Sequence, residues 1–343
     1  MDLPTTMTAM VLVGHGGPEQ LVLRDDVPVP RPASDEVLIE VGASAVNNTD
    51  INTRVGWYSR GAQESGWSGT PMPFPRIQGA DCCGRIVAVG AAVDPRRIGE
   101  RVLVRTMQAS RMVDGVIRQV TLGSEIDGAF AEYVAVRSAE AFAVDSPLSD
   151  AELATFPCSS STAEGLVSRA EVGPGDRLLV TGASGGVGSA VVQLARARGA
   201  KVVAVTSKPA EVLALGAFEA LTTQELPSLA ADSVDVVIDL VGGQGFAALL
   251  RVLRPRGRYA VSGAVGGAHV DLDLRDLYLK DLTLYGCTFH PPEVFASLVS
   301  RIEAQEISPL LAATYPLAQL GEAQERFARK DFVGKIAIQV ASH

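Results

Sequence analysis

Length, composition and charge already exclude several classes of protein. The chain has 343 residues, of which 47% are hydrophobic and 20% charged, and its formal net charge is −9. It is longer than one ordinary domain, so we expect two domains with a large buried core. An acidic chain lacks the excess of lysine and arginine that nucleic-acid and acidic-membrane surfaces require, so neither is an expected partner.

The cysteines and the first residues bear on the cellular compartment. Four cysteines in so long a chain do not form a disulfide framework, and no pair has the CxxC spacing of a structural zinc site. The N-terminal residues MDLPTTMTAM lack the basic and apolar segments of a signal peptide. No apolar run approaches the roughly 18 residues that span a bilayer. We therefore expect a cytoplasmic protein.

The N-terminal part of the chain has the pattern of a β domain. Short runs rich in Val and Ile alternate with Gly, Pro and Asp, as in a barrel or a sandwich. The expected strands are residues 8–13, 36–41, 84–90, 100–104 and 131–136. Two further stretches, 59–73 and 105–127, lack this pattern and are expected to be irregular.

From residue 149 the pattern changes to alternating helices and strands. A helix is expected at 149–170, and later helices at 189–199, 209–216 and 245–257. The expected strands between them are 176–182, 201–207, 234–242 and 257–263. Continuous apolar strands that alternate with helices indicate a doubly wound parallel sheet covered on both faces.

The end of the chain is expected to return to the first domain. Helices at 293–305 and 317–330 precede a last strand at 334–340, which would be an orphan on the parallel sheet. We therefore expect an α/β protein with a discontinuous β domain, residues 1–148 and 291–343. Its dinucleotide-binding domain would span residues 149–290.

The strongest chemical signal is the segment LLVTGASGGVGSAVVQLA, residues 178–195. A strand, a glycine-rich turn and a helix follow one another, as in the dinucleotide-binding fingerprint, with Ala183, Gly185 and Gly188 at its three glycine positions. Backbone N–H groups at the helix N-terminus would bind the pyrophosphate. The expected cofactor contacts are Ala183, Ser184, Gly185, Gly186, Val187 and Gly188. The alternative is a glycine-rich turn without a ligand.

The end of the second strand distinguishes NADPH from NADH. An NAD enzyme places Asp or Glu there to bind the ribose hydroxyls. Here Ser207 and Lys208 stand at this point, and they can hydrogen-bond and neutralise a 2′-phosphate. We therefore expect NADPH, the alternative being that Lys208 is a solvated surface lysine. Val241 and Gly263, at the ends of the next two strands, are also expected to contact the cofactor.

These segments resemble the medium-chain dehydrogenase/reductase superfamily, in its zinc-free quinone oxidoreductase branch. The resemblance covers nearly the whole chain and rests on residues 128–136, 172–195, 235–243 and 332–340. It implies a GroES-like β-barrel domain made of both chain ends, a Rossmann domain and an active-site cleft between them. It also implies a homodimer formed by the edge strands of two Rossmann sheets, and it places Thr162 beside the nicotinamide.

The same resemblance indicates that the catalytic zinc of the wider superfamily is missing. The three ligand positions of the zinc enzymes correspond here to Asn47, Ala80 and Cys158. One thiolate cannot replace the three protein ligands that a catalytic zinc needs. The cysteines that bind structural zinc in those enzymes are also missing from residues 105–127. We therefore expect no metal, and we expect Cys158 to be a small buried residue.

Tyr58 is the expected proton donor. It falls where the zinc-free enoyl thioester reductases that the chain resembles carry their catalytic tyrosine. A phenol with a pKa of about 10 can protonate an enolate or donate a hydrogen bond to its oxygen. The alternative is a tyrosine that packs beside the cofactor and only orients it. Asn47 and Asp50 resemble residues that line the nicotinamide and substrate pocket, although Asp50 suits a turn or a helix cap equally well.

Three functions are consistent with these observations. The leading one is an NADPH-dependent reductase of quinones or α,β-unsaturated carbonyl compounds, with a small apolar substrate. The second is a zinc-free alcohol or carbonyl dehydrogenase, and the third is a non-catalytic NADPH-binding protein. The glycine-rich turn together with Tyr58 favours an enzyme. The sequence does not identify the natural substrate.

Overall fold

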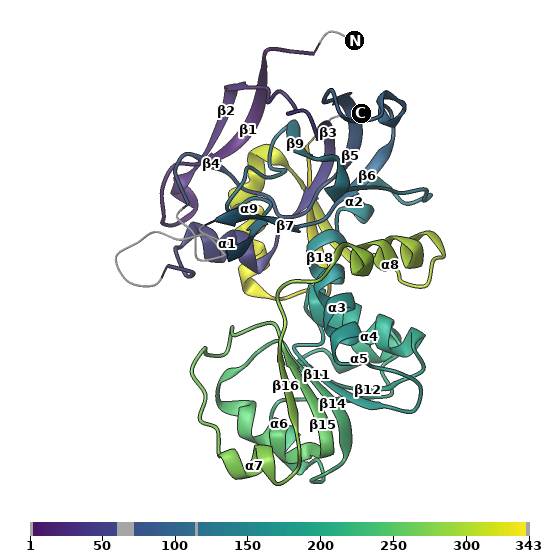
Figure 1. Cartoon of the computed structure of the whole chain (residues 1–343). Coiled ribbons are helices and arrows are strands. Elements are labelled where there is room, and N and C mark those ends of the chain that lie inside the picture. Colours follow the sequence, from purple (N-terminus) through teal and green to yellow (C-terminus); the bar gives the residue numbers. More distant parts are fainter. Residues whose placement is uncertain (1–2, 60–71, 114–115, 341–343) are drawn as a thin grey trace. The chain divides into compact units, whose positions relative to one another are not determined.

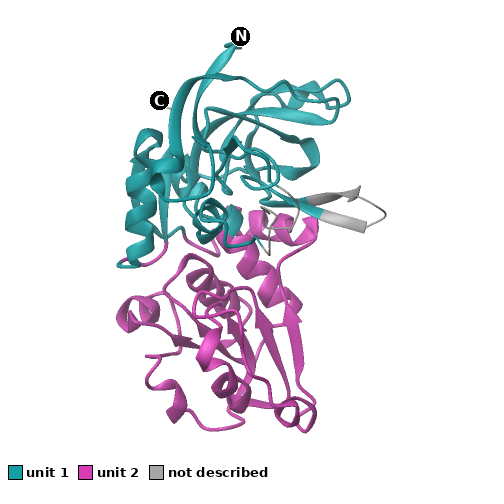
Figure 2. Ribbon diagram, turned by 90° about the vertical axis from the view of Figure 1, so that its left-hand side faces the viewer, with its two compact units in different colours: residues 1–158, 309–331, 335–343 teal, residues 159–308, 332–334 magenta. Residues whose placement is uncertain are grey.

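The structure is a computed structural model that describes residues 3–59, 72–113 and 116–340. The chain divides into two compact units (Figure 2). Unit 1 consists of Met1–Cys158, Pro309–Asp331 and Lys335–His343, and unit 2 consists of Ser159–Ser308 and Phe332–Gly334. Most of the predicted irregular stretch 59–73 lies outside the described residues.

Unit 1 is built mainly from antiparallel sheets (Figure 1). Its strands are β1 (Thr6–Leu12), β2 (Leu21–Pro28), β3 (Glu36–Ala45), β4 (Arg76–Ile77), β5 (Cys83–Val89), β6 (Arg101–Val104), β7 (Met107–Val113), β8 (Val116–Thr121), β9 (Tyr133–Arg137), β10 (Ala141–Ala143), β17 (Leu311–Pro316) and β18 (Lys335–Gln339). One sheet has the order β2-β1-β4, and a larger one has the order β10-β6-β5-β3-β18-β17. The α-helices among the described residues of this unit are α1 (Asn48–Arg54), α2 (Asp150–Leu153) and α9 (Leu320–Arg329).

Strand β3 is the centre of the larger sheet and brings both ends of the chain together. It pairs antiparallel with β5, β9 and β18. In β3, the side chains of Val37, Ile39 and Val41 are fully buried in one apolar cluster, because apolar side chains from neighbouring strands pack around them. The last strand, β18, pairs Ala337 with Ala45. The start of α1 and the C-terminal strand therefore meet at the same end of β3.

Two parts of unit 1 differ from the sequence-based expectation. The stretch 105–127, expected to be irregular, contains an antiparallel hairpin of β7 and β8. Polar residues interrupt the apolar alternation of both strands, so their pattern does not predict them. Strand β17, which pairs parallel with β18 at the sheet edge, was also missed, because its sequence LAATYP is only weakly apolar.

Unit 2 is a parallel α/β sheet, which confirms the predicted doubly wound class. Its strands are β11 (Arg177–Thr181), β12 (Lys201–Val205), β13 (Glu219–Leu221), β14 (Val234–Asp239), β15 (Leu253–Val261) and β16 (Thr283–Gly286). Its helices are α3 (Pro157–Arg169), α4 (Gly186–Ala197), α5 (Pro209–Ala214), α6 (Phe246–Val252), α7 (Leu274–Tyr278) and α8 (Pro292–Glu303). The strand order is β13-β12-β11-β14-β15-β16. Successive strands are added on one side of β11 up to β13 and then on its other side from β14 to β16, so the two halves of the sheet meet between β11 and β14. Sheets of this class bind ligands at that point.

Two predicted helices end or divide at prolines. The helix expected at 149–170 is divided into α2 and α3 because Pro157, which has no N–H group, starts a new helix. The helix expected at 245–257 ends at Val252, and β15 then runs through Pro255. Proline in the interior of a helix would remove a hydrogen bond and clash with the preceding turn.

The compact units differ from the expected domain limits at both junctions. Residues 149–158 cluster with unit 1, and residues 291–308 cluster with unit 2. A buried carboxylate explains the second difference. Glu164 on α3 accepts hydrogen bonds from Arg198 at 2.7 and 3.1 Å and from Ser297 of α8 at 3.1 Å. This network fastens α8 to the parallel-sheet unit.

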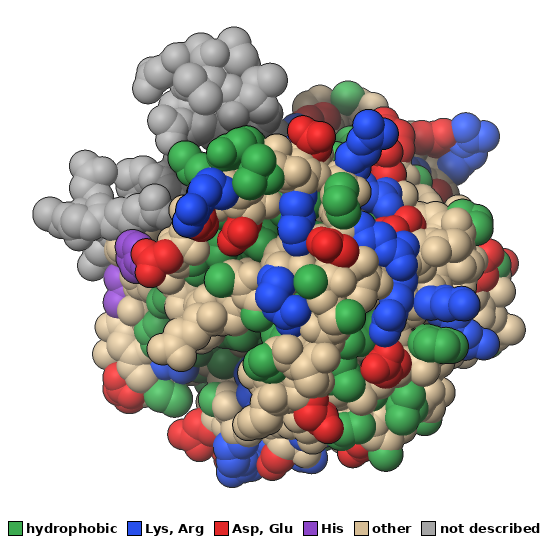
Figure 3. Space-filling view, turned by 90° about the horizontal axis from the view of Figure 1, so that it is seen from below, with side chains coloured by type: hydrophobic (Ala, Val, Ile, Leu, Met, Phe, Trp, Pro, Cys, Tyr) green, Lys and Arg blue, Asp and Glu red, His purple; other side chains and the backbone are tan. Residues whose placement is uncertain are grey.

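The surface fits an acidic chain of mixed charge. Figure 3 shows one face, on which basic, acidic and apolar side chains neighbour one another. Among the described residues, no helix has the length and apolar character needed to cross a bilayer.

Candidate active site

The turn from β3 into α1 carries two of the predicted site residues. Asn47 is extended and caps α1, and its backbone N–H donates to Asp50 Oδ2 at 2.8 Å. Asp50 Oδ1 accepts a hydrogen bond from the Ala80 N–H at 3.3 Å, and Gln78 Nε2 donates to the Asp50 carbonyl at 2.8 Å. Asp50 is therefore a helix cap that also ties the loop 78–80 to α1. From the sequence, Asp50 suited either a pocket residue or a helix cap, and the structure shows the cap.

Burial changes the acidity of Asp50. The side chain is almost inaccessible to water. Burial, with a smaller contribution from the nearby Asp81 carboxylate, raises the pKa of Asp50 to about 7, while the Asn47 N–H, the Lys335 ammonium and the Ala80 N–H oppose this shift. Desolvation disfavours the charged form of a carboxyl group. Asp50 therefore exchanges its proton near neutral pH, unlike an ordinary aspartate.

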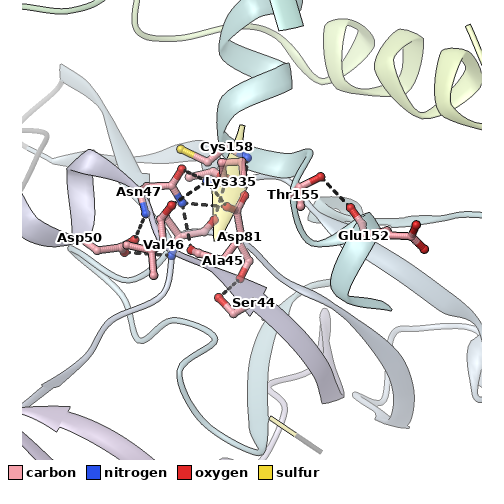
Figure 4. A network of polar contacts seen from close by, with 12 residues as sticks. Ser44, Ala45, Val46, Asn47, Asp50, Asp81, Glu152, Thr155, Cys158 and Lys335 are labelled. Carbon is pink, nitrogen blue, oxygen red and sulfur yellow. Dashed lines mark hydrogen bonds and ion pairs between the residues drawn. The ribbon is translucent and has the colours of Figure 1, made fainter. Parts of the chain in front are cut away.

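Lys335 completes this cluster and was not among the site residues predicted from the sequence. It is the first residue of β18, and only 3% of it is exposed. Its ammonium donates to the Val46 carbonyl and to Asp81 Oδ2, both at 2.9 Å, and also to Asn47 Oδ1 (Figure 4). All three N–H donors of the ammonium have acceptors. A charged residue at the start of a buried C-terminal strand was the available signal.

Asp81 and Asn47 are held in fixed orientations by the same cluster. Asp81 Oδ1 accepts a 2.6 Å hydrogen bond from the Cys158 backbone N–H. The Asn47 amide nitrogen donates to Asp81 Oδ2 at 2.8 Å and to the Ala45 carbonyl at 3.2 Å. Both amide hydrogens of Asn47 are therefore in use, and its oxygen accepts from Lys335. This leaves Asn47 no amide hydrogen to donate to a substrate.

The residues at the three zinc-ligand positions do not fit a zinc ion. The amide oxygen of Asn47 already binds an ammonium group, and Ala80 has no ligand atom. Burial, and then the charge of Asp81, raises the pKa of Cys158 above its ordinary value, which favours the thiol over the thiolate that zinc needs. Within residues 3–59, 72–113 and 116–340, no group of three or more His, Cys, Asp or Glu side chains is placed to hold a metal ion.

Tyr58 lies just beyond the end of α1. Its hydroxyl donates to Thr49 Oγ1 at 3.3 Å and accepts a hydrogen bond from Asn52 Nδ2 at 3.5 Å. Burial raises the pKa of Tyr58, and the Cys158 and Asp50 side chains add smaller contributions in the same direction. The phenol is therefore protonated at neutral pH and lies within electrostatic range of the Asp50 cluster. Thr49, two residues after Asn47, was not among the site residues predicted from the sequence.

The glycine-rich turn at which the sequence predicts cofactor binding lies between β11 and α4 of unit 2. Gly182 has a φ of +62°, and Gly185 caps the twelve-residue helix α4. A Cβ atom at Gly188 would lie 2.3 Å from the Gly182 carbonyl oxygen, so only glycine fits there. At Gly185 the nearest atom to such a Cβ would be 3.4 Å away, and the residue is exposed. The first-turn N–H groups of α4 can bind an anion.

The remaining predicted cofactor residues follow neighbouring strands of the same sheet. Ser207 is exposed and Lys208 half-buried, and the Lys208 N–H donates to Thr206 Oγ1 at 3.0 Å. Val241 lies against the glycine-rich turn, because its Cγ2 would be 3.3 Å from a Cβ atom at Gly182. Gly263 follows β15, and Thr162 is half-buried on α3.

Comparison with family models matches each unit separately. A model described as the alcohol dehydrogenase GroES-like domain matches residues 33–146, and one described as zinc-binding dehydrogenase matches residues 186–304. The first range lies in unit 1 and the second in unit 2. The β-rich unit is therefore the GroES-like domain that the resemblance implied, and the parallel sheet is its Rossmann partner.

Whole-chain relatives point to the same superfamily. The quinone oxidoreductase of Rattus norvegicus is 30% identical over 93% of each chain. The acryloyl-coenzyme A reductase of Sulfurisphaera tokodaii is 28% identical over 94% of this chain and 98% of its own. A solved structure from Sinorhizobium meliloti 1021, provisionally named an alcohol dehydrogenase, is 44% identical, with a TM-score of 0.91 over 99% of this chain and 98% of the other. The chain therefore belongs to the medium-chain dehydrogenase/reductase superfamily, in its quinone oxidoreductase-like branch.

Proposed function

We propose that this protein is a zinc-independent, NADPH-dependent reductase of quinones or α,β-unsaturated carbonyl compounds. The observation that carries the proposal is the cluster around Asn47, in which the Lys335 ammonium binds an atom at a zinc-ligand position. Residues of this kind cannot polarise an alcohol or ketone oxygen as a metal does. A quinone or a conjugated C=C bond accepts hydride without that help, because the carbonyl already in the substrate takes up the charge.

The proposed roles of the residues follow from their chemistry. The turn 182–188 and Lys208 would hold the dinucleotide, which supplies a hydride when bound. Tyr58 would donate its hydroxyl proton, or a hydrogen bond, to the enolate oxygen that develops on the substrate. Asp50 and Lys335 would keep α1 and Asn47 in place beside Tyr58. Two relatives support this assignment, since one is named a quinone oxidoreductase and the other an acryloyl-coenzyme A reductase.

An assay with three substrate classes tests the proposal against its alternatives. NADPH oxidation should be fast with quinones or enones and slow with simple aldehydes and ketones. A zinc-free alcohol or carbonyl dehydrogenase, which the provisional name of the Sinorhizobium relative favours, would show the opposite order. A protein that binds NADPH but oxidises it with none of the three would be the non-catalytic alternative.

Cofactor preference gives a first prediction. Lys208 stands where a carboxylate would bind the ribose of NADH, so NADPH should bind at least about tenfold more tightly than NADH. The variant Lys208→Asp should narrow or reverse this ratio, because a carboxylate repels the 2′-phosphate. Fluorescence titration of both nucleotides measures the ratio of their affinities. Lys201→Asp serves as a control, since Lys201 is exposed at the start of β12, the strand that Lys208 follows. Equal affinities in the parent protein would contradict the assignment.

Metal independence gives a second prediction. The purified protein should contain much less than one zinc per chain, and incubation with a chelator should leave its reductase activity unchanged. Elemental analysis before and after chelation measures both. A tightly bound zinc that is lost together with the activity would show that the positions of Asn47 and Ala80 have been misread.

We also propose a homodimer formed through the edge of the unit 2 sheet. Strand β16 ends that sheet, so one side of its backbone is available to pair with a second strand. Apolar side chains near this edge are exposed, with Leu274, Tyr278 and Leu279 of the α7 region at 63%, 62% and 69%. Sedimentation velocity should therefore give a species of twice the 35.9 kDa chain mass, and a monomer would refute the proposal.

A further inference from the structure

A buried carboxylate joins three neighbouring strands of unit 2 at their C-terminal ends. Asp239, the last residue of β14, has no exposed surface. Its Oδ1 accepts hydrogen bonds from Thr181 Oγ1 at 2.6 Å, from the Val241 N–H at 3.0 Å and from the Gly242 N–H at 3.1 Å. Its Oδ2 accepts a hydrogen bond from the Tyr259 hydroxyl at 2.6 Å. The four donors are all neutral groups.

The strand register explains why these groups meet. Val180 pairs with Ile238 across β11 and β14, so the next residues, Thr181 and Asp239, lie side by side. Asp239 pairs with Val261 across β14 and β15, and Tyr259 lies on the same face two residues earlier. Burial and the Asp239 carboxylate raise the pKa of Tyr259, which therefore remains a donor. Removing a carboxylate from water carries a large desolvation cost, which these hydrogen bonds offset.

Three of the four donors to Asp239 belong to, or directly precede, a segment assigned above to the cofactor, and the fourth, Tyr259, lies on β15 four residues before Gly263. Thr181 immediately precedes Gly182 of the glycine-rich turn, and its hydroxyl also accepts the Leu240 N–H at 2.9 Å. Val241 contacts the Gly182 position. A Cβ atom at Gly263 would lie 2.3 Å from the Leu240 carbonyl oxygen, so the turn after β14 lies closely against the turn after β15.

The turn after β14 depends on the carboxylate for its shape. Gly242 and Gly243 have φ values of +69° and +71°, a conformation that glycine adopts without strain. The hydrogen bonds from the Val241 and Gly242 N–H groups to Asp239 hold this turn closed. Asp239 therefore holds Val241 beside Gly182 through two hydrogen bonds. One comes from the Val241 N–H, and the other comes from the hydroxyl of Thr181, which directly precedes Gly182.

We propose that Asp239 and Thr181 form a positioning pair that sets the spacing of the three segments that hold the nicotinamide dinucleotide. The pair itself does not touch the cofactor. It aligns the glycine-rich turn, the Val241 turn and the Gly263 turn before the cofactor arrives, so the binding energy is not spent on ordering them. This inference rests on the proposed dinucleotide site.

Two substitutions of Thr181 separate positioning from packing. Thr181→Val keeps the shape but removes the hydroxyl, so it breaks the bonds to Asp239 and to the Leu240 N–H. Thr181→Ser keeps the hydroxyl and serves as the conservative variant. The Kd for NADPH should rise about tenfold in Thr181→Val and stay within about twofold of the parent in Thr181→Ser. Asp239→Asn is a second test and should also raise the Kd, because the amide is a weaker acceptor for the turn N–H groups.

A core variant controls for lost stability. Val234→Ala removes a fully buried side chain of the unit 2 core at the opposite end of β14 from Asp239, where it pairs with Leu253. It should lower the melting temperature while leaving the Kd for NADPH, measured well below that temperature, unchanged. If Thr181→Val and Asp239→Asn also lower only the melting temperature, the pair is structural and the inference is overturned. If the parent protein binds neither NADPH nor NADH, the proposed function itself fails, and this inference fails with it.

Discussion

Replacing Tyr58 by Phe should lower kcat on an enone by about 10²–10⁴-fold, while the Kd for NADPH stays nearly unchanged. This range corresponds to roughly 3–5 kcal/mol of barrier, the usual contribution of a positioned general acid. The hydroxyl of Tyr58 is held by Thr49 and Asn52, and its raised pKa keeps it protonated at neutral pH. The measurement is steady-state NADPH oxidation at saturating cofactor, on the best enone found.

The substrate and the control decide how this result is read. With a quinone, hydride transfer gives a phenolate that water can protonate, so the effect there should be smaller. Tyr133→Phe removes a hydroxyl of the same unit, which lies 3.4 Å from Glu40, and should leave kcat unchanged. If Tyr58→Phe keeps the parent kcat on the enone, the proton comes from elsewhere, and Tyr58 is a packing residue.

Replacing Lys335 by Met should destabilise unit 1 by roughly 3–5 kcal/mol, the usual cost of removing one partner of a buried ion pair. The substitution leaves Asp81 buried with its charge unbalanced, and it leaves the Val46 carbonyl without the Lys335 donor. Both tryptophans of the chain, Trp57 and Trp67, belong to unit 1. Urea unfolding followed by tryptophan fluorescence therefore reports on this unit.

Two further variants control for this prediction. Arg24→Met removes one partner of an exposed ion pair on β2 of the same unit and should leave the free energy of unfolding nearly unchanged. The double variant Lys335→Met with Asp81→Asn should be more stable than Lys335→Met alone, because it removes the unbalanced carboxylate. A Lys335→Met protein as stable as the Arg24→Met control would show that the buried ion pair contributes little.

The parts of the protein that the sequence predicted well are those whose pattern lies in one contiguous segment. The turn 182–188 is recognisable because its strand, its glycines and its helix occupy adjacent residues, and the structure places them as that pattern predicts. The alternation of strands and helices in unit 2 is local in the same sense. Errors arose where local signals were weak, as in the hairpin of β7 and β8 and in the edge strand β17.

The composition of the polar clusters was decided only by the tertiary structure. Lys335 lies 254 residues from Asp81 and 288 from Asn47 in the sequence, and the pairing of β18 with β3 brings them together. Asp239 meets Thr181 in the same way, 58 residues apart, through the register of β11 and β14. A shift of one residue in either register would turn these side chains to the opposite face of the sheet. Strand pairing between distant segments leaves no local pattern, so the sequence by itself identified the glycine-rich turn, while only the fold brought together the residues of the two polar clusters.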